Sequence, residues 1–309
     1  MRSWTFSSFQ PSRLLTPACI VLGLGSFVAC GGGGDSSGDD GTAGLSKEGP
    51  AVNFAQLYPK EGAVVVSKMA WNWVVAWQGT NLAGQDVTSS DENIIITTKE
   101  ATYVRFEDGK PVELVVKTVE EKESTISNMK GEVSAENKEG SLVGREVREI
   151  HGPNGWEAVL LGEEPNLEQS AELEDWEFEL EGHHEMYPDR AVNVGESWVV
   201  DGEEALAMFG NDQDMESASV AILFAGYQSC DSGQCAVLTG ETEHTMRSEE
   251  DVSTRVSFNG KFKQVVDPVT GVSLFYSLKG EMSTEASMGP GVQLKGSGPI
   301  NIITRGSLR

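Results

Sequence analysis

Residues 252–262 read VSTRVSFNGKF, and every second residue in this stretch is apolar or small. The alternation resumes after turn-forming residues at 267–271 to cover 272–282, and again after 288–291 to cover 292–302. A period of two residues is the pattern of a strand that buries one face of a sheet. Together with the apolar runs at 220–227 and 236–238, the C-terminal part of the chain predicts an antiparallel meander of long strands.

Four glycines fall on the inward side of this pattern, namely Gly260, Gly280, Gly296 and Gly298. Strands of the predicted length would extend to about 50 Å at roughly 3.3 Å per residue, and flat sheets of that size are unusual. Glycine inside a strand marks a bend or a close approach of backbone. The sequence therefore predicts a strongly curved sheet that resembles half of a barrel.

The N-terminal half repeats the pattern less regularly. Strand-like runs occupy 94–98, 102–106, 112–119, 125–129, 143–150 and 156–161, with turn signals at 108–111 and 152–155. Short helices are expected at 202–209 and in the first half of 166–180. We predict an all-β or β-dominated α+β fold of long curved antiparallel sheets, with a β region at 51–165, a helix-containing connector and meander at 166–309, and one related sheet in each half.

The start of the chain has the parts of an export signal. Arg2 and Arg13 precede an apolar segment at 14–28, which is shorter than the roughly 20 residues that cross a bilayer. Residues 27–30, FVAC, resemble the lipobox of bacterial lipoproteins, with Phe27 in place of the usual Leu. The resemblance implies a signal peptide at 1–29 and a diacylglycerol on Cys30, and two acyl chains suffice for stable anchoring to the bilayer. A secreted protein with an unused cysteine is the alternative.

Residues 30–50 are almost entirely Gly, Ser, Asp, Thr and Ala, a composition that predicts a disordered tether. Gly31 is not the aspartate that retains lipoproteins in the inner membrane of enteric bacteria, so the resemblance places the protein in the cell envelope at the outer membrane. The chain has 23 Lys and Arg against 48 Asp and Glu, a formal net charge of −25. Such a charge repels phosphate backbones and excludes nucleic acid as a partner.

Two cysteines flank the turn-forming residues DSGQ at 231–234. In an exported protein, Cys230 and Cys235 across a hairpin loop favour a disulfide over a free or metal-binding pair. Residues 188–198, PDRAVNVGESW, resemble a group of uncharacterised bacterial lipoproteins with a Val-x-Val-Gly-Glu-Ser-Trp segment before a closing meander. That resemblance implies location and fold and brings no catalytic residue or ligand. Gly195 would form a turn and Trp198 would anchor the next strand.

An aromatic cluster, Trp71, Trp73 and Trp77, lies within MAWNWVVAW at 69–77. On a strand the three indoles would share one face with Val75, and an exposed row could stack on sugar rings or hold an acyl chain. On a helix they would spread around the axis. Packing in the core is the alternative to a ligand-binding role.

No catalytic, cofactor or metal site is predicted. The only clustered histidines, His183 and His184, lie beside Glu185 without a second ligand group at recognised spacing. We expect a non-enzymatic binding or structural protein, with the bilayer as partner through acylated Cys30 and an envelope protein or hydrophobic ligand as the other. Two alternatives remain open: a carrier of lipid on a concave sheet face, resembling half-barrel lipoprotein-handling proteins, and an envelope-polymer hydrolase with paired carboxylates.

Overall fold

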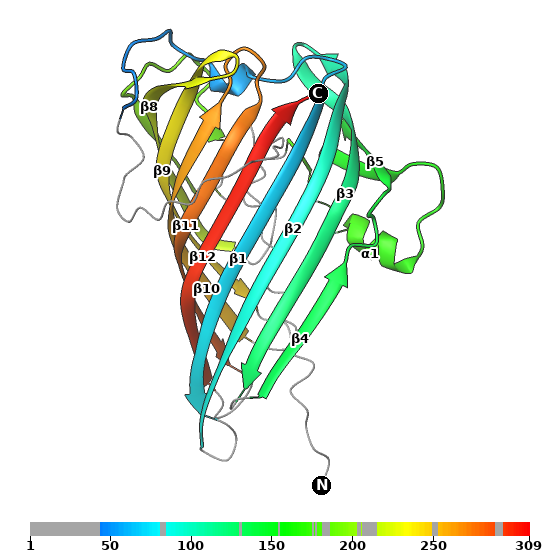
Figure 1. Cartoon of the computed structure of the whole chain (residues 1–309), viewed down its shortest axis with the longest axis vertical. Coiled ribbons are helices and arrows are strands. Elements are labelled where there is room, and N and C mark those ends of the chain that lie inside the picture. The colour runs from blue at the N-terminus through cyan, green and yellow to red at the C-terminus, as the bar shows by residue number, and fades with distance from the viewer. Residues whose placement is uncertain are drawn as a thin grey trace.

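The computed structural model describes residues 44–80, 85–129, 132–153, 155–174, 176, 178–180, 186–202, 205, 215–248, 253–287 and 293–309. Within these ranges the chain forms one antiparallel sheet of twelve strands, strongly curved so that one face is concave (Figure 1). The strands are β1 (Val64–Thr80), β2 (Asp86–Glu107), β3 (Lys110–Met129), β4 (Glu132–Glu139), β5 (Glu146–Gly152), β6 (Gly155–Leu160), β7 (Ser197–Asp201), β8 (Met215–Cys230), β9 (Gly233–Ser248), β10 (Ser253–Val266), β11 (Ser273–Ser287) and β12 (Gln293–Leu308).

The strand order is β6-β5-β3-β2-β1-β12-β11-β10-β9-β8-β7, with β4 paired to the far half of β3. β1 pairs with β12 along nearly its whole length, which joins the N-terminal and C-terminal strands into one sheet instead of the expected two. The reason is that β1 and β12 would otherwise be long free edges, and their apolar residues alternate in matching register. The predicted β-dominated curved fold is confirmed.

The tight turn between β2 and β3 was predicted from Asp108-Gly109. Both residues have positive φ, 50° and 80°, as a two-residue hairpin loop requires. The separate runs expected at 94–98 and 102–106 form the single strand β2, and those at 112–119 and 125–129 form β3. The sequence breaks these strands into pieces because polar residues take their inward positions between the runs, and because the pairing shifts register between Thr98 and Lys99.

Glycines on the concave face leave room for aromatic rings, a close approach in addition to the bends that the sequence predicted. A Cβ atom at Gly260 would come 2.6 Å from the Phe258 ring, and one at Gly280 would come 2.8 Å from the same ring. Gly240 stands in the same relation to Phe262, at 2.6 Å. Since these distances are shorter than any real carbon contact, a side chain at these positions would force the rings to move.

A segment outside the sheet packs against part of its concave side. Residues 44–58 lie at the upper end of the sheet in Figure 1, and single bridges join Ser46 to Tyr227 and Val52 to Val192. In the short 3-10 turn Phe54–Gln56, the Phe54 ring stacks on Tyr187 with centroids 5.5 Å apart. The core therefore forms between the sheet and these covering segments.

The first half of 166–180 is helical as predicted, in α1 (Leu167–Glu174). A reciprocal capping box begins the helix, because Gln169 N donates to Asn166 Oδ1 (2.9 Å) and Asn166 N donates to Gln169 Oε1 (3.0 Å). The helix expected at 202–209 lies almost wholly outside the described residues. Among the residues that are described, no helix is long and apolar enough to cross a membrane.

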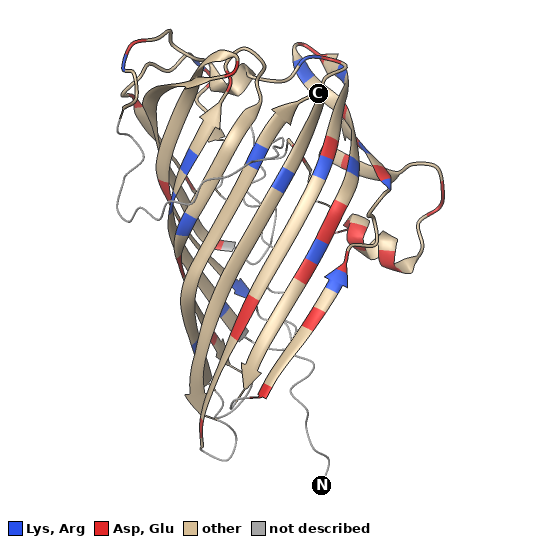
Figure 2. Ribbon diagram, viewed as in Figure 1, with Lys and Arg blue, Asp and Glu red and all other residues tan. Residues whose placement is uncertain are grey.

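The convex face is polar. Figure 2 shows which strands carry acidic residues, chiefly β3 and β4 with α1, and few on β1 and β12. Some of these residues point to the concave side, as Glu123 does opposite Ile95. Cross-strand ion pairs join Lys261 to Glu241 (2.9 Å) and Lys295 to Glu285 (2.5 Å). Such exposed pairs add little to the stability of the fold, so these charges mainly hydrate the convex face.

Candidate functional site

Trp71, Trp73 and Trp77, called the indole row below, all lie on β1 and face the concave side together with Val75. Of the two arrangements that the sequence left open for these side chains, strand or helix, the structure has the strand. Trp71 and Trp73 are 4% and 3% exposed, with ring centroids 4.8 Å apart, and Trp77 is half-buried. The first two indoles thus pack in the core, and the third lies at its margin.

The neighbours of the indole row differ between its two sides. On β12, Ile302 and Ile300 lie opposite Trp71 and Trp73. On β2, Ile95 lies opposite Trp71, and Asn93 lies opposite Trp73. Residues directly opposite in an antiparallel pair point to the same face. The row therefore has apolar residues on the β12 side and the first polar side chain on the β2 side.

Beyond the row, the concave face becomes polar. Trp77 Nε1 donates to Asp91 Oδ2 (2.7 Å), and Thr125 Oγ1 donates to Asn93 Oδ1 (2.7 Å). Glu123 and Ser127 of β3 follow in register with Ile95 and Asp91. The concave surface changes from apolar to polar along β2, which is a suitable boundary for an amphipathic molecule.

Two donor groups at this boundary are buried without an acceptor. Trp71 Nε1 and Asn93 Nδ2 find no hydrogen-bond partner in the part of the chain that the structure describes. Most buried polar groups in folded proteins are hydrogen-bonded, so each exception calls for a cause. Sequence reasoning singled out Trp71 but missed Asn93. The sequence feature that could have indicated Asn93 is its position in β2, directly after the polar residues that begin the strand and directly before the apolar run at 94–98.

A second cluster lies at the other end of the sheet, where Glu149 and Glu179 form a buried carboxyl pair. Glu149 Oε1 accepts from Trp176 Nε1 (2.9 Å), and the backbone N–H of Glu179 contacts both carboxylate oxygens (3.4 and 3.3 Å). Lys99 Nζ lies 3.5 Å from Glu179 Oε1 and 4.8 Å from the centre of the Trp176 ring. Burial, and then the neighbouring Glu179 charge, raise the pKa of Glu149 to about 8.

The buried carboxyl pair does not match the hydrolase alternative. Glu149 is 0% and Glu179 3% exposed, whereas glycoside hydrolysis needs two carboxyls that reach the substrate in one cleft. The sequence showed 48 acids and no reason to select these two. The signal that could have found Glu149 is its alternation with Val147 on β5, which places both on the inward face.

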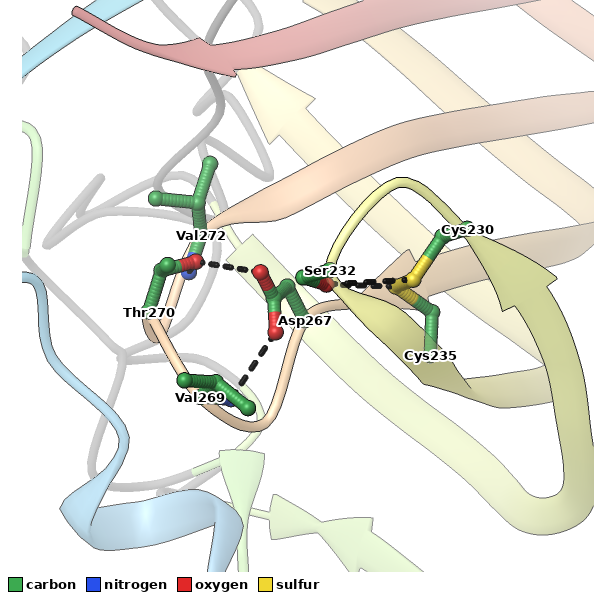
Figure 3. The surroundings of a disulfide bond; sticks show 7 residues. All are labelled: Cys230, Ser232, Cys235, Asp267, Val269, Thr270 and Val272. Carbon is green, nitrogen blue, oxygen red and sulfur yellow. Dashed lines mark hydrogen bonds between the residues drawn. A yellow bond between two sulfur atoms is a disulfide. The ribbon is translucent and has the colours of Figure 1, made fainter.

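The predicted disulfide between Cys230 and Cys235 is confirmed. It closes the β8–β9 hairpin beside the loop that joins β10 to β11, where Asp267 accepts hydrogen bonds from Val269 N and Thr270 Oγ1, both 2.8 Å (Figure 3). Cys235 is fully buried against Val237 and Val265. The bridge joins the two strands of one hairpin across its loop and has a structural role.

Of the other residues named from the sequence, some lie among the described residues and some lie outside them. Gly195 has φ 89°, as its turn requires, and Trp198 is partly buried with its Nε1 donating to Met186 O (2.9 Å). Cys30, His183, His184 and Glu185 lie outside the described residues. Within the described ranges, no group of three or more His, Cys, Asp and Glu side chains is placed to hold a metal ion.

No protein-family model matches the chain, and no curated protein matches it. Among solved structures, it is similar to OccK7 (OpdD) of Pseudomonas aeruginosa at 6% identity and a TM-score of 0.26, over 80% of this chain and 100% of that one. OccK2 (OpdF) of the same organism is similar at 8% identity and a TM-score of 0.16, over 73% and 62% of the two chains. TM-scores this low carry no argument about fold or function, so the function is inferred below from the residues of the concave face alone.

Proposed function

We propose that this protein is an envelope lipoprotein, anchored at the outer membrane through Cys30, that binds an apolar or amphipathic ligand on the concave face of its sheet. Binding is its working role, without catalysis. The membrane location is inferred from the lipobox-like residues 27–30, and the binding role from the surface formed by β1, β2 and β12.

The observation that carries the proposal is the boundary beside the indole row. Trp71 and Trp73 are buried between Ile95, Ile300 and Ile302, and half-buried Trp77 lies at the margin of this apolar cluster. The polar residues of β2 and β3 begin at Asn93, opposite Trp73. Sites for small molecules combine apolar and aromatic walls with a few placed polar groups. This composition fits an acyl chain that carries a polar end.

The two faces of the sheet support the same assignment. Exposed ion pairs such as Lys261–Glu241 and Lys295–Glu285 lie on the convex face, and the buried apolar side chains of the core cluster lie on the concave side. A ligand with an apolar part is therefore accommodated on the concave face, which is also the face that carries the indole row.

Lipid analysis of the full chain, expressed with its own export signal in a bacterial host, tests both parts of the proposal. Mass spectrometry of the membrane-extracted protein should find a diacylglycerol thioether on Cys30. A Cys30→Ala variant should appear in the soluble envelope fraction, remain folded by circular dichroism, and still carry a co-purifying apolar molecule.

The two parts fail separately. Continued sedimentation of Cys30→Ala with membranes would disprove the anchor and leave the binding role standing. A soluble variant from which no apolar molecule is extracted, and which binds no fluorescent acyl probe, would refute the binding role and leave the anchor standing.

A further inference from the structure

We propose that Trp71 and Asn93 bind an uncharged carbonyl oxygen of the ligand, of the kind present in an acyl ester. The inference rests on the proposed function, because it specifies which chemical group of an amphipathic ligand the concave face recognises. It is drawn from two buried donor groups and from the charges that surround them.

The first donor is the indole N–H of Trp71. Trp71 and Trp77 lie on the same strand and face, and Trp77 Nε1 has an acceptor in Asp91. Trp71 is more deeply buried, yet its Nε1 has no acceptor anywhere in the described ranges. A buried donor without a partner loses its hydration and gains nothing in return. A bound acceptor would remove this penalty.

The second donor is the amide nitrogen of Asn93, which is 3% exposed. The hydroxyl of Thr125 donates to Asn93 Oδ1, which orients the amide and leaves Nδ2 without a partner among the described residues. Asn93 is the diagonal neighbour of Trp71, next to Ile95 on β2. Diagonal neighbours in an antiparallel pair are within reach of aromatic side chains, so one bound group can contact both donors.

The surrounding charges select a neutral acceptor. Asp91 lies two residues from Asn93 on the same face, and Glu123 lies opposite Ile95. Like charges repel strongly where water is excluded, so these carboxylates oppose a bound carboxylate or phosphate. The chain as a whole also carries a formal net charge of −25. An ester carbonyl accepts hydrogen bonds without bringing a negative charge.

Apolar walls next to the donors accommodate the chain that adjoins the carbonyl. Ile95 and Ile302 flank Trp71, and Ile300 flanks Trp73, so the surface is apolar in the direction of β12. We infer that the carbonyl lies at β2 and that the hydrocarbon extends across β1 toward β12.

Three fluorescent probes of equal length test the inference: pyrene-labelled dodecane, the methyl ester of pyrenedodecanoic acid, and the free acid. They are titrated into the full exported chain carrying Cys30→Ala, so that no detergent is needed. The ester should bind about tenfold more tightly than the hydrocarbon, as expected for one net hydrogen bond. The free acid at pH 8 should bind more weakly than the ester.

Trp71→Phe and Asn93→Leu remove the donors and keep the side-chain volume. Each should weaken ester binding by about five- to tenfold and leave hydrocarbon binding within about twofold. Trp156→Phe, in a separate cluster on β6, is the matched control and should change neither affinity. Because each variant is judged by its ester-to-hydrocarbon ratio, a change in folding alone cannot imitate the result, and Trp71→Phe suffices if Asn93→Leu does not fold.

The outcomes are distinguishable. An ester-to-hydrocarbon ratio that is unchanged in both variants would show that water satisfies these donors, and would overturn the inference while the proposed function stands. Tighter binding of the free acid would overturn the choice of a neutral group. Failure of all three probes to bind the folded chain would refute the proposed binding role and this inference with it.

Discussion

Trp176 Nε1 donates a 2.9 Å hydrogen bond to Glu149 Oε1 and so covers a carboxyl group that is fully shielded from solvent. A carboxylate in such a place is destabilised by desolvation, and the nearby Glu179 adds like charge. Burial and the Glu179 charge raise the pKa of Glu149, the hydrogen bond from Trp176 opposes part of this rise, and the net shift makes the stability of the fold sensitive to pH.

Glu149→Gln should reduce the loss of stability between pH 5 and pH 8. The pKa of Glu149 rises from 4.5 to about 8 on folding, so within this window the folded protein holds a proton that the unfolded chain has released. The free energy of unfolding then falls as pH rises, by at most about 1.4 kcal/mol per pH unit. Urea unfolding at both pH values should show the variant gaining about 2–4 kcal/mol over the wild type from pH 5 to pH 8. Glu157→Gln, at an exposed position on β6, should show no such gain, and parallel profiles for Glu149→Gln would contradict the assignment.

His244→Gln should act in the opposite direction. Burial lowers the pKa of His244 from 6.5 to about 4, and its ring lies 4.9 Å from Phe258. Within that window the unfolded chain binds the proton first, so the wild type loses stability as pH falls from 6.5 toward 4. Relative to the wild type, the variant should become more stable as pH falls. The prediction fails if the difference in unfolding free energy between the two proteins stays constant over this range.

Gly280→Ala should destabilise the fold by about 1–3 kcal/mol, the usual range for overpacking. The new methyl group would collide with the Phe258 ring and with backbone, neither of which can move without disturbing the curved sheet. Gly152→Ala is the control, because a Cβ there meets only one atom, 3.9 Å away. Thermal unfolding of the two variants should separate them, and equal melting temperatures would show that the bend at Gly280 tolerates a side chain.

Replacing both Cys230 and Cys235 with Ala should lower the free energy of unfolding by about 2 kcal/mol, since the closed loop is short. Treating the wild type with a reductant should give a similar loss, which tests whether the bond itself is responsible. Binding of the acyl probes should not change, because the bridge closes the β8–β9 hairpin, and β10, β11 and β12 separate β9 from the strand β1 that carries the indole row. Loss of probe binding would show that this hairpin forms part of the site.

Much of the fold was predictable because it depends on local patterns. Alternation at 252–262, 272–282 and 292–302 predicted the strands of the meander. The Asp108-Gly109 pair predicted a tight turn, and both residues have positive φ in the structure. The cysteine pair could be assigned from its spacing and compartment. The N-terminal strands were predicted too short, because polar inward residues such as Thr97 and Glu121 interrupt the apolar period although the backbone continues.

The candidate site was predictable only in part. The sequence indicated that Trp71, Trp73 and Trp77 would share a face if they lay on a strand. It could not indicate that Asn93 and Ile300 would lie on either side of Trp73, because those contacts join residues far apart in the chain. The buried carboxyl pair was unpredictable for the same reason, since an isolated glutamate on a strand is ordinarily exposed.

By itself, the sequence determined the strand periodicity, the tight turns, the inward positions of the strand glycines, the disulfide pairing and the acidic composition. Each of these depends on composition or on residues close together in the chain. Only the tertiary structure decided that β1 pairs with β12 to make one sheet, that the buried donors of Trp71 and Asn93 have no partner among the described residues, and that Trp176 donates to the buried carboxyl of Glu149. These depend on which distant segments lie side by side, and a side chain's burial and hydrogen bonding are set by what covers it, which no local pattern records.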